Sequence, residues 1–411
     1  MSQPTIPLLA QLIRQSAEQQ EVISIYEYLH LAKDISNAYL VNTDDGDVMI
    51  NTGFMSTIER NQRFFDGKRT GPLRAIFLNQ AHPDHYGGVP AFAESDTQII
   101  AGQGFTETWQ FFHMLDDFLR TRSGEIWATT IQNRTMTVPE VIPTLMVNER
   151  QSFDIGGRTF EVIPTPGGES PDAVVIWMPK EKIVFCGNLF GPIINSVPNL
   201  CTMRGDKPRS AKRWLAGVDT VRRLGAEMLF AGHTDPIKGA DGIRNTLDRM
   251  YNAVLSIHDQ TVAGMNAGKD VHTLMREIKV PEEFTLGEYH GKVNWAVRTI
   301  WEEYAGWFHM DSTTSLYDVP ASSVAPDIVR LAGASALCAS AQQKAASNNP
   351  LEALHLIDIV LNAEPSNADA LAVKKQALGQ LIVASGGDNM SEVMWLRTQM
   401  GKVDALLGNA S

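Results

Sequence analysis

Apolar residues between about residues 22 and 237 fall into short runs that are separated by turn residues. Because β-branched and aromatic side chains dominate these runs, and the run at 158–164 alternates at period two, each run predicts a β-strand. Asp45 and Gly46 separate the first two runs and predict a hairpin turn. Helical spacing at 105–121 and 210–224 interrupts the strands, so the segment predicts an α/β layered fold. The predicted strands are 37–42, 48–51, 73–78, 97–101, 158–164, 173–178, 183–186 and 228–231.

From about residue 240 onward the strand signals disappear and apolar residues recur at helical spacing. Helices are predicted at 243–267, 271–278 and 293–308, and alanine-rich helices continue to about residue 407. The segment from 349 onward is typical of one tetratricopeptide-type helix pair. A single pair cannot bury both of its faces, so we interpret it as a docking or dimerisation unit. We therefore expect an α/β domain at 1–248 and a helical domain at 249–411.

Composition limits the classes of protein to which the chain can belong. Of 411 residues, 44% are hydrophobic and 20% charged, which is typical of a chain that buries a core. The net charge of −12 argues against binding to nucleic-acid backbones. No apolar run approaches the roughly 18 to 20 residues of a membrane span, and the N-terminal segment does not have the pattern of a secretory signal. Three scattered cysteines fit a reducing compartment, so we expect a soluble, cytoplasmic protein.

The segment 77–88, FLNQAHPDHYGG, concentrates candidate metal ligands on one loop. His82, Asp84 and His85 follow a hydrophobic run and precede a double glycine, which places them at the C-terminal end of a predicted strand. Two imidazoles and a carboxylate suit a first-row metal ion. A lone histidine would more often be structural, but packing gives no reason to concentrate so much polarity on one turn. The segment therefore predicts a metal site or a former metal site.

Several segments, in order along the chain, resemble motifs of the metallo-β-lactamase superfamily and its alkyl sulfatase branch. Residues 80–85 are similar to the His-x-His-x-Asp-His signature, and 165–171 resemble the branch's Thr-Pro-Gly-Thr-Glu-Ala-Pro. Residues 229–236 resemble the last ligand segment, and 199–209 resemble the segment that lines the sulfate pocket. Further similarity continues to about residue 405, but no segment resembles the sterol-carrier-like domain that ends many alkyl sulfatases.

The resemblance implies a fold, an assembly and a set of site residues. The fold is an αββα metallo-β-lactamase sandwich followed by an all-α dimerisation domain of the alkyl sulfatase type, and the assembly is a homodimer. The implied metal ligands are His82, Asp84, His85, Glu169 and His233, and the implied substrate-binding residues are Asn199, Arg204 and Arg209.

Two positions depart from the family pattern. Gln80 stands where the signature has its first histidine, and Asn188 stands where the family has an acid that bridges two metals. Each could be a metal ligand or could contact one. Alternatively, Asn188 could simply cap a turn and Gln80 could hydrogen-bond a loop carbonyl. Asp84, His85 and His233 keep a complete set with an open position, the arrangement of a catalytic zinc. We therefore expect one tightly bound Zn²⁺, with the second site weak or absent.

The predicted function is that of a zinc-dependent hydrolase. Zinc lowers the pKa of bound water from 15.7 towards about 7 and provides hydroxide at neutral pH. Asp84 would orient the water, and Arg204 would hold an anionic ester group bidentately. The resemblance implies an alkyl sulfate or a related anionic ester as substrate. A single-zinc lyase, a hydrolase of another ester or lactone, and a catalytically degenerate binding protein are the alternatives.

Overall fold

Two compact units make up the described residues, which are 6–127, 138–207 and 209–409 of a computed structural model. The larger unit is drawn from residues 8–120 and 133–304, and the smaller one from residues 1–7, 121–132 and 305–411. The domain boundary predicted at residue 248 stays a prediction. One continuous helix, α8 (Ala240–Asn266), runs through this position.

The larger unit contains two β-sheets. The first has the strand order β1-β2-β3-β4-β5-β6-β7; pairing is antiparallel from β1 to β4 and parallel from β4 to β7. The second has the order β13-β12-β11-β10-β9-β8, and its one parallel pair is β11 with β12. The strands are β1 (Ile23–Tyr26), β2 (Leu29–Ala32), β3 (Ala38–Thr43), β4 (Gly46–Ile50), β5 (Leu73–Leu78), β6 (Gln98–Gly102), β7 (Leu145–Val147), β8 (Gln151–Ile155), β9 (Arg158–Pro164), β10 (Val174–Met178), β11 (Ile183–Phe185), β12 (Met228–Phe230) and β13 (Ile237–Lys238).

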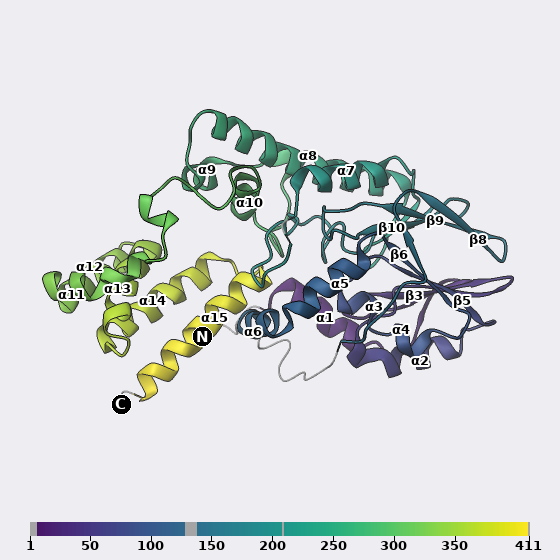
Figure 1. The fold of residues 1–411 in the computed structure, drawn as a ribbon, viewed down its shortest axis with the longest axis horizontal. Coiled ribbons are helices and arrows are strands. Elements are labelled where there is room, and N and C mark those ends of the chain that lie inside the picture. The colour runs from purple at the N-terminus through teal and green to yellow at the C-terminus, as the bar shows by residue number, and fades with distance from the viewer. Residues whose placement is uncertain (1–5, 128–137, 208, 410–411) are drawn as a thin grey trace. The chain divides into compact units, whose positions relative to one another are not determined.

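Helices lie outside both sheets (Figure 1). The described α-helices of the first 305 residues, besides α8, are α1 (Leu8–Ala17), α2 (Ile58–Asp66), α3 (Pro83–Tyr86), α4 (Val89–Phe92), α5 (Phe105–Met114), α6 (Asp116–Trp127), α7 (Ala211–Arg222), α9 (Val271–Glu277) and α10 (Val293–Ala305). The helix predicted at 105–121 is therefore two helices. Helix α5 ends before Leu115, and α6 begins at Asp116. Asp116 and Asp117 lie in the first turn of α6, where negative charges interact favourably with the helix dipole.

Three apolar clusters define the layers of the larger unit. The cluster between the sheets contains Phe77 from the first sheet and Phe160, Phe185 and Phe230 from the second, all fully buried. A second cluster joins the first sheet to α2, α4 and α5, and a third joins the second sheet to α7, α8 and α10. The order of layers is helix, sheet, sheet, helix. The predicted αββα sandwich is confirmed.

The hairpin predicted near residue 45 is formed by β3 and β4, but its turn lies one residue earlier than predicted. Thr43 pairs with Gly46, so Asp44 and Asp45 form the turn and Gly46 begins β4. Gly46 has a φ of 110°, and a Cβ atom there would lie 2.4 Å from the Pro72 carbonyl oxygen. Glycine is thus required by the close approach of a neighbouring segment rather than by the turn.

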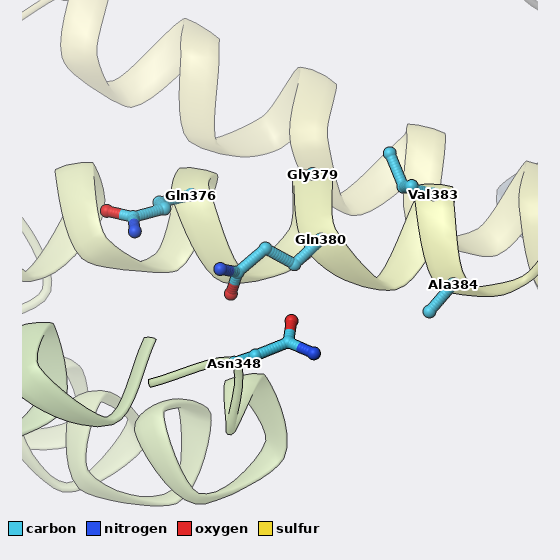
Figure 2. A pocket seen from close by; sticks show the side chains of 6 residues that line it. All are labelled: Asn348, Gln376, Gly379, Gln380, Val383 and Ala384. Carbon is cyan, nitrogen blue, oxygen red and sulfur yellow. The ribbon is translucent and has the colours of Figure 1, made fainter. Parts of the chain in front are cut away.

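The helical part of the smaller unit confirms the predicted alanine-rich helices. They are α11 (Ala325–Ala332), α12 (Ala334–Ala346), α13 (Pro350–Ala363), α14 (Ala368–Ala384) and α15 (Met390–Asn409). Ala341, Ala345 and Ala353 are fully buried at the contact of α12 with α13, because small side chains let two helices approach closely. A hollow of about 480 Å³ lies beside α14, lined by Gln376, Gln380 and Asn348 among others (Figure 2).

Within the described ranges, no single helix has both the length and the apolar character needed to cross a membrane. One pair of helical segments, Ala321–Ala332 and Ala334–Ala346, meets both criteria together but is bent by 102°. The predicted cytoplasmic location stays a prediction.

Candidate metal centre

The loop that carries the candidate ligands is held in place by two asparagines. It leaves β5 at Asn79, whose side-chain amide donates to the carbonyl oxygens of Val174 (2.8 Å) and Phe185 (3.2 Å) in the second sheet. The Asn51 amide donates to Asn79 Oδ1 at 2.8 Å, and the Asn79 backbone N–H donates to Asn51 Oδ1 at 3.0 Å. Every one of these groups is buried, so the loop starts from a fixed point that links both sheets.

Asp84, His85 and His233 converge on one point. Asp84 Oδ2 lies 3.8 Å from His85 Nε2 and 3.7 Å from His233 Nε2, and one ligand atom from each residue lies within 4.8 Å of the other two. The imidazole planes of the two histidines cross at 88°. The Ser36 hydroxyl lies 3.3 Å from both ring nitrogens of His85. Two nitrogens and a carboxylate oxygen at this spacing fit a single divalent ion.

Electrostatics keeps the three groups in the protonation states that metal binding requires. Burial lowers the pKa of His85, and it lowers the pKa of His233 to about 4, although Asp84 opposes both shifts. Burial alone would raise the pKa of Asp84, but His85, His233 and His82 together bring it below its ordinary value. The imidazoles are therefore neutral and the carboxylate ionised near pH 7, as metal ligands must be. His233 Nδ1 has no hydrogen-bond partner in the part of the chain that the structure describes.

His233 is placed by the tight packing of the residue before it. The Gly232 backbone N–H donates to the Gly187 carbonyl oxygen at 2.8 Å, and the Gly232 carbonyl oxygen accepts from the Asn37 N–H at 2.6 Å. A Cβ atom on Gly232 would lie only 2.3 Å from Asn188 Oδ1. Glycine at this position thus lets the loop after β12 pass close to the loop after β11.

Asn188 lies beside the group formed by Asp84, His85 and His233. Its side chain is buried, and it is one of the groups that act on the pKa of His85. Asn188 Oδ1 has no hydrogen-bond partner among the described residues. An amide oxygen can coordinate a metal, but it brings no negative charge to hold two cations together. Whether Asn188 is a ligand stays a prediction.

The residues predicted for the first metal lie together but have other partners. The Gln80 side-chain amide nitrogen contacts His82 Nδ1 closely, and the same His82 nitrogen lies 3.8 Å from Glu169 Oε1. Glu169 Oε1 is in turn 2.9 Å from an Arg209 guanidinium nitrogen. Burial raises the pKa of Glu169 to about 7, although Arg209 lowers it. Of the described His, Cys, Asp and Glu side chains, only Asp84, His85 and His233 form a group close enough to hold an ion.

A buried carboxylate that the sequence did not single out completes this region. Asp206 Oδ2 lies 3.2 Å from Arg209 Nη2 and 3.6 Å from Arg204 Nη2. It also lies 3.8 Å from His82 Nε2, and Glu169 Oε1 lies at the same distance from His82 Nδ1. The Arg204 guanidinium also faces the Phe112 ring of α5 at 5.6 Å.

The predicted substrate-binding residues are joined to a histidine, His290, that the sequence analysis did not single out. Arg209 Nη1 donates to the Asn199 carbonyl oxygen at 2.9 Å, and Asn199 Nδ2 lies 3.1 Å from His290 Nε2. Burial, followed by the charges of Arg209, His233 and Arg204, lowers the pKa of His290 to about 3. His290 is therefore neutral near pH 7 and lies against the predicted substrate-binding residue Asn199. The metal and substrate roles of all these residues stay predictions.

Comparison with known proteins agrees with this organisation. Residues 31–233 match the metallo-beta-lactamase superfamily, and residues 271–396 match the alkyl sulfatase dimerisation family. A linear primary-alkylsulfatase from a Pseudomonas sp. is 26% identical over 327 residues, which cover 72% of this chain and 60% of the relative. An alkyl/aryl-sulfatase of Saccharomyces cerevisiae is 24% identical over 380 residues, which cover 85% of this chain and 58% of the relative. The chain thus spans about 60% of the length of these relatives.

A solved structure shares the fold. The stereoselective inverting sec-alkylsulfatase from Pseudomonas sp. superimposes with a TM-score of 0.84 at 19% sequence identity, covering 97% of this chain and 70% of the other. The superfamily implies binding of a divalent metal ion, and the donor set of Asp84, His85 and His233 fits one. With a metallo-β-lactamase domain and an alkyl sulfatase dimerisation domain in one chain, the protein belongs to the alkyl sulfatase-like branch of the metallo-β-lactamase superfamily.

Proposed function

We propose that the protein is a zinc-dependent hydrolase that cleaves an alkyl sulfate or a related anionic ester. One observation carries the proposal: a cluster with the geometry of a divalent-ion site lies next to a group of ion-paired side chains that contains two arginines. The His82 ring, which lies 3.8 Å from Asp206 of that group, is 6.4 Å from the His85 ring of the cluster, centroid to centroid. The alkylsulfatase names of the relatives support the sulfate ester as substrate.

Asp84, His85 and His233 would hold one zinc ion. Zinc bound there supplies Lewis acidity and makes a coordinated water molecule more acidic. The second position is weak or absent in our proposal, because Glu169 is already ion-paired with Arg209 and Gln80 contributes no charge. Restoring two full sites would need donors that this chain does not have at positions 80 and 188.

The remaining residues bind and orient the substrate. Arg204 and Arg209 attract the sulfate oxygens, since a planar guanidinium can donate two parallel hydrogen bonds. Asn199, which contacts His290, places an amide at the same wall of the pocket. Asp84 orients the attacking water and can accept its proton. The net reaction consumes one ester and one water and yields an alcohol and hydrogen sulfate, which loses a proton at neutral pH.

The test is release of inorganic sulfate from a series of primary alkyl sulfates by zinc-loaded protein. Sulfate production at a rate well above that of a His85→Ala variant is the expected result. Reaction in ¹⁸O-labelled water separates hydrolysis from elimination by a single-zinc lyase, because only hydrolysis must place solvent oxygen in a product. Zinc-loaded, folded protein that releases no sulfate from any chain length would refute the proposal and favour a binding protein.

We also propose a homodimer. The segment that matches the dimerisation family exposes several large apolar side chains, namely Trp307 (73% exposed), Met310 (84%), Tyr317 (69%) and Leu331 (77%). Monomeric proteins rarely leave such residues gathered in one segment, and twofold pairing is the usual way to cover them.

A further inference from the structure

Asp206 stands inside the pocket that we propose for the anionic group of the substrate. Its side chain is 7% exposed, and one of its oxygens lies 3.2 Å from Arg209 Nη2 and 3.6 Å from Arg204 Nη2. These are the two guanidinium groups that should attract the sulfate oxygens. A carboxylate therefore already occupies the neighbourhood into which an anion must bind.

Each of the two arginines of the pocket has a carboxyl partner. Arg204 and Arg209 each carry one positive charge, while Asp206 and Glu169 are the acids paired with them. His82 lies 3.8 Å from both acids, through Nδ1 to Glu169 Oε1 and through Nε2 to Asp206 Oδ2. The two arginines thus do not form an uncompensated positive patch.

We infer that Asp206 is a specificity-determining residue, a fixed negative charge that admits a singly charged ester and disfavours a doubly charged anion. This inference rests on the proposed function. The Coulomb energy between Asp206 and a bound anion is proportional to the charge of the anion, so a dianion is repelled about twice as strongly as a monoanion in the same position. Phosphate monoesters near neutral pH are accordingly poorer ligands than sulfate monoesters.

The same charge has a consequence for the end of the reaction. The ester R–O–SO₃⁻ carries one negative charge, whereas the product loses a proton to become SO₄²⁻ with two. Hydrolysis therefore increases the repulsion between Asp206 and the bound group at the moment when that group must leave. Asp206 both selects the substrate and speeds release of the product.

The experiment measures binding rather than turnover. Zinc-loaded wild type and the Asp206→Asn variant are titrated by calorimetry at constant ionic strength with methanesulfonate and with inorganic sulfate. These two probes share the tetrahedral sulfonyl oxygens but differ by one charge. Removing the carboxylate should increase sulfate affinity about 10-fold to 100-fold and methanesulfonate affinity by only about 3-fold to 10-fold, since the electrostatic energy is halved for the monoanion.

Two further variants control for charge and structure. Asp206→Glu keeps the negative charge, so its preference for methanesulfonate over sulfate should equal that of the wild type. Asp241→Asn removes an acid that is paired with Arg244 at the surface (2.5 Å), and it should leave both affinities unchanged. If Asp206→Asn lowers the melting temperature enough to leave unfolded protein at the assay temperature, Asp206→Ser removes the same charge with a smaller side chain and takes its place.

Three results would overturn the inference. Equal gains for the two probes would show that Asp206 does not discriminate by charge, and weaker binding of both would show that it only holds the arginines in place. If folded, zinc-loaded wild type and Asp206→Asn bind neither probe, the anion pocket itself is wrong. Loss of the proposed function looks different, because a protein without sulfatase activity can still show the two-probe selectivity, and an active sulfatase can lack it.

Discussion

Replacement of Gly232 by alanine tests how closely the ligand loops are packed. The added methyl carbon would lie 2.3 Å from Asn188 Oδ1 and 3.3 Å from the Gly187 carbonyl carbon and oxygen. To reach even 3.0 Å, the methyl carbon and Oδ1 must separate by about 0.7 Å. The Gly232 backbone cannot easily provide this movement, because its N–H and C=O are both hydrogen-bonded, at 2.8 and 2.6 Å.

The size of the effect follows from these contacts. Forcing one extra carbon into a packed site costs about 1 to 3 kcal/mol of the free energy of unfolding. Alanine also lowers the conformational entropy of the unfolded chain, which stabilises the folded protein by about 0.4 to 1 kcal/mol. We therefore expect a net loss of roughly 1 to 2 kcal/mol. Because His233 is the next residue, displacement of Gly232 should also weaken zinc binding by about 10-fold to 100-fold.

Urea unfolding of metal-free protein and competitive zinc titration would measure the two effects. Gly242→Ala is the matched control: no atom lies within 4 Å of the added methyl, and this helical position should gain about 0.5 to 1 kcal/mol. The Asn188→Ala substitution removes the clashing oxygen. The loss of stability in the double variant Gly232→Ala, Asn188→Ala should therefore be smaller than the sum of the losses in the two single variants. Unchanged stability and zinc affinity in Gly232→Ala would refute the argument that this contact positions His233.

Three further predictions concern the pocket, the metal and the assembly. Arg204→Ala should lower kcat/KM about 30-fold to 1000-fold, equivalent to roughly 2 to 4 kcal/mol for one buried charge-assisted contact, with zinc content unchanged. Arg204→Lys should restore little, because a point charge does not reproduce the planar fork; normal turnover in folded Arg204→Ala would contradict an anionic substrate. Elemental analysis after dialysis should find nearer one zinc than two per chain, and two would mean that Gln80 and Asn188 act as ligands or are bypassed. Light scattering at micromolar concentration should give about twice the 45.3 kDa chain mass, and a particle of one chain mass would argue against the dimer.

The local parts of the site could be predicted because its chemistry is concentrated in short segments. His82, Asp84 and His85 follow a buried strand and precede a double glycine, and the structure places this loop where the pattern predicted it. The strands themselves are confirmed to within a few residues, since burial between two layers leaves a continuous apolar run such as β10. The proximity of His233 to Asp84 came from family resemblance, because periodicity carries no information about which loops meet.

The sequence analysis did not single out Asp206 or His290, and the reason is physical. Asp206 sits between two arginines in a loop, where an acid is most simply interpreted as a solvated residue. The role that we propose for it depends on burial against side chains that only the folded chain brings together. His290 has no polar motif around it, yet it lies against Asn199, 91 residues earlier in the chain. Long-range pairing of buried polar groups leaves no regular pattern in the order of residues.

The position of the predicted ligands relative to the strands bears on how this protein can change. His82, Glu169, Asn188 and His233 come after the C-terminal ends of β5, β9, β11 and β12, and the last three strands run in the same direction. None of these side chains belongs to a strand pair or to the apolar layer between the sheets. Mutations can therefore alter the number and kind of donors while the stability of the sandwich is kept. In evolutionary terms, substitutions at the predicted metal centre, such as Gln80 and Asn188, can accumulate or be reversed while the fold stays the same.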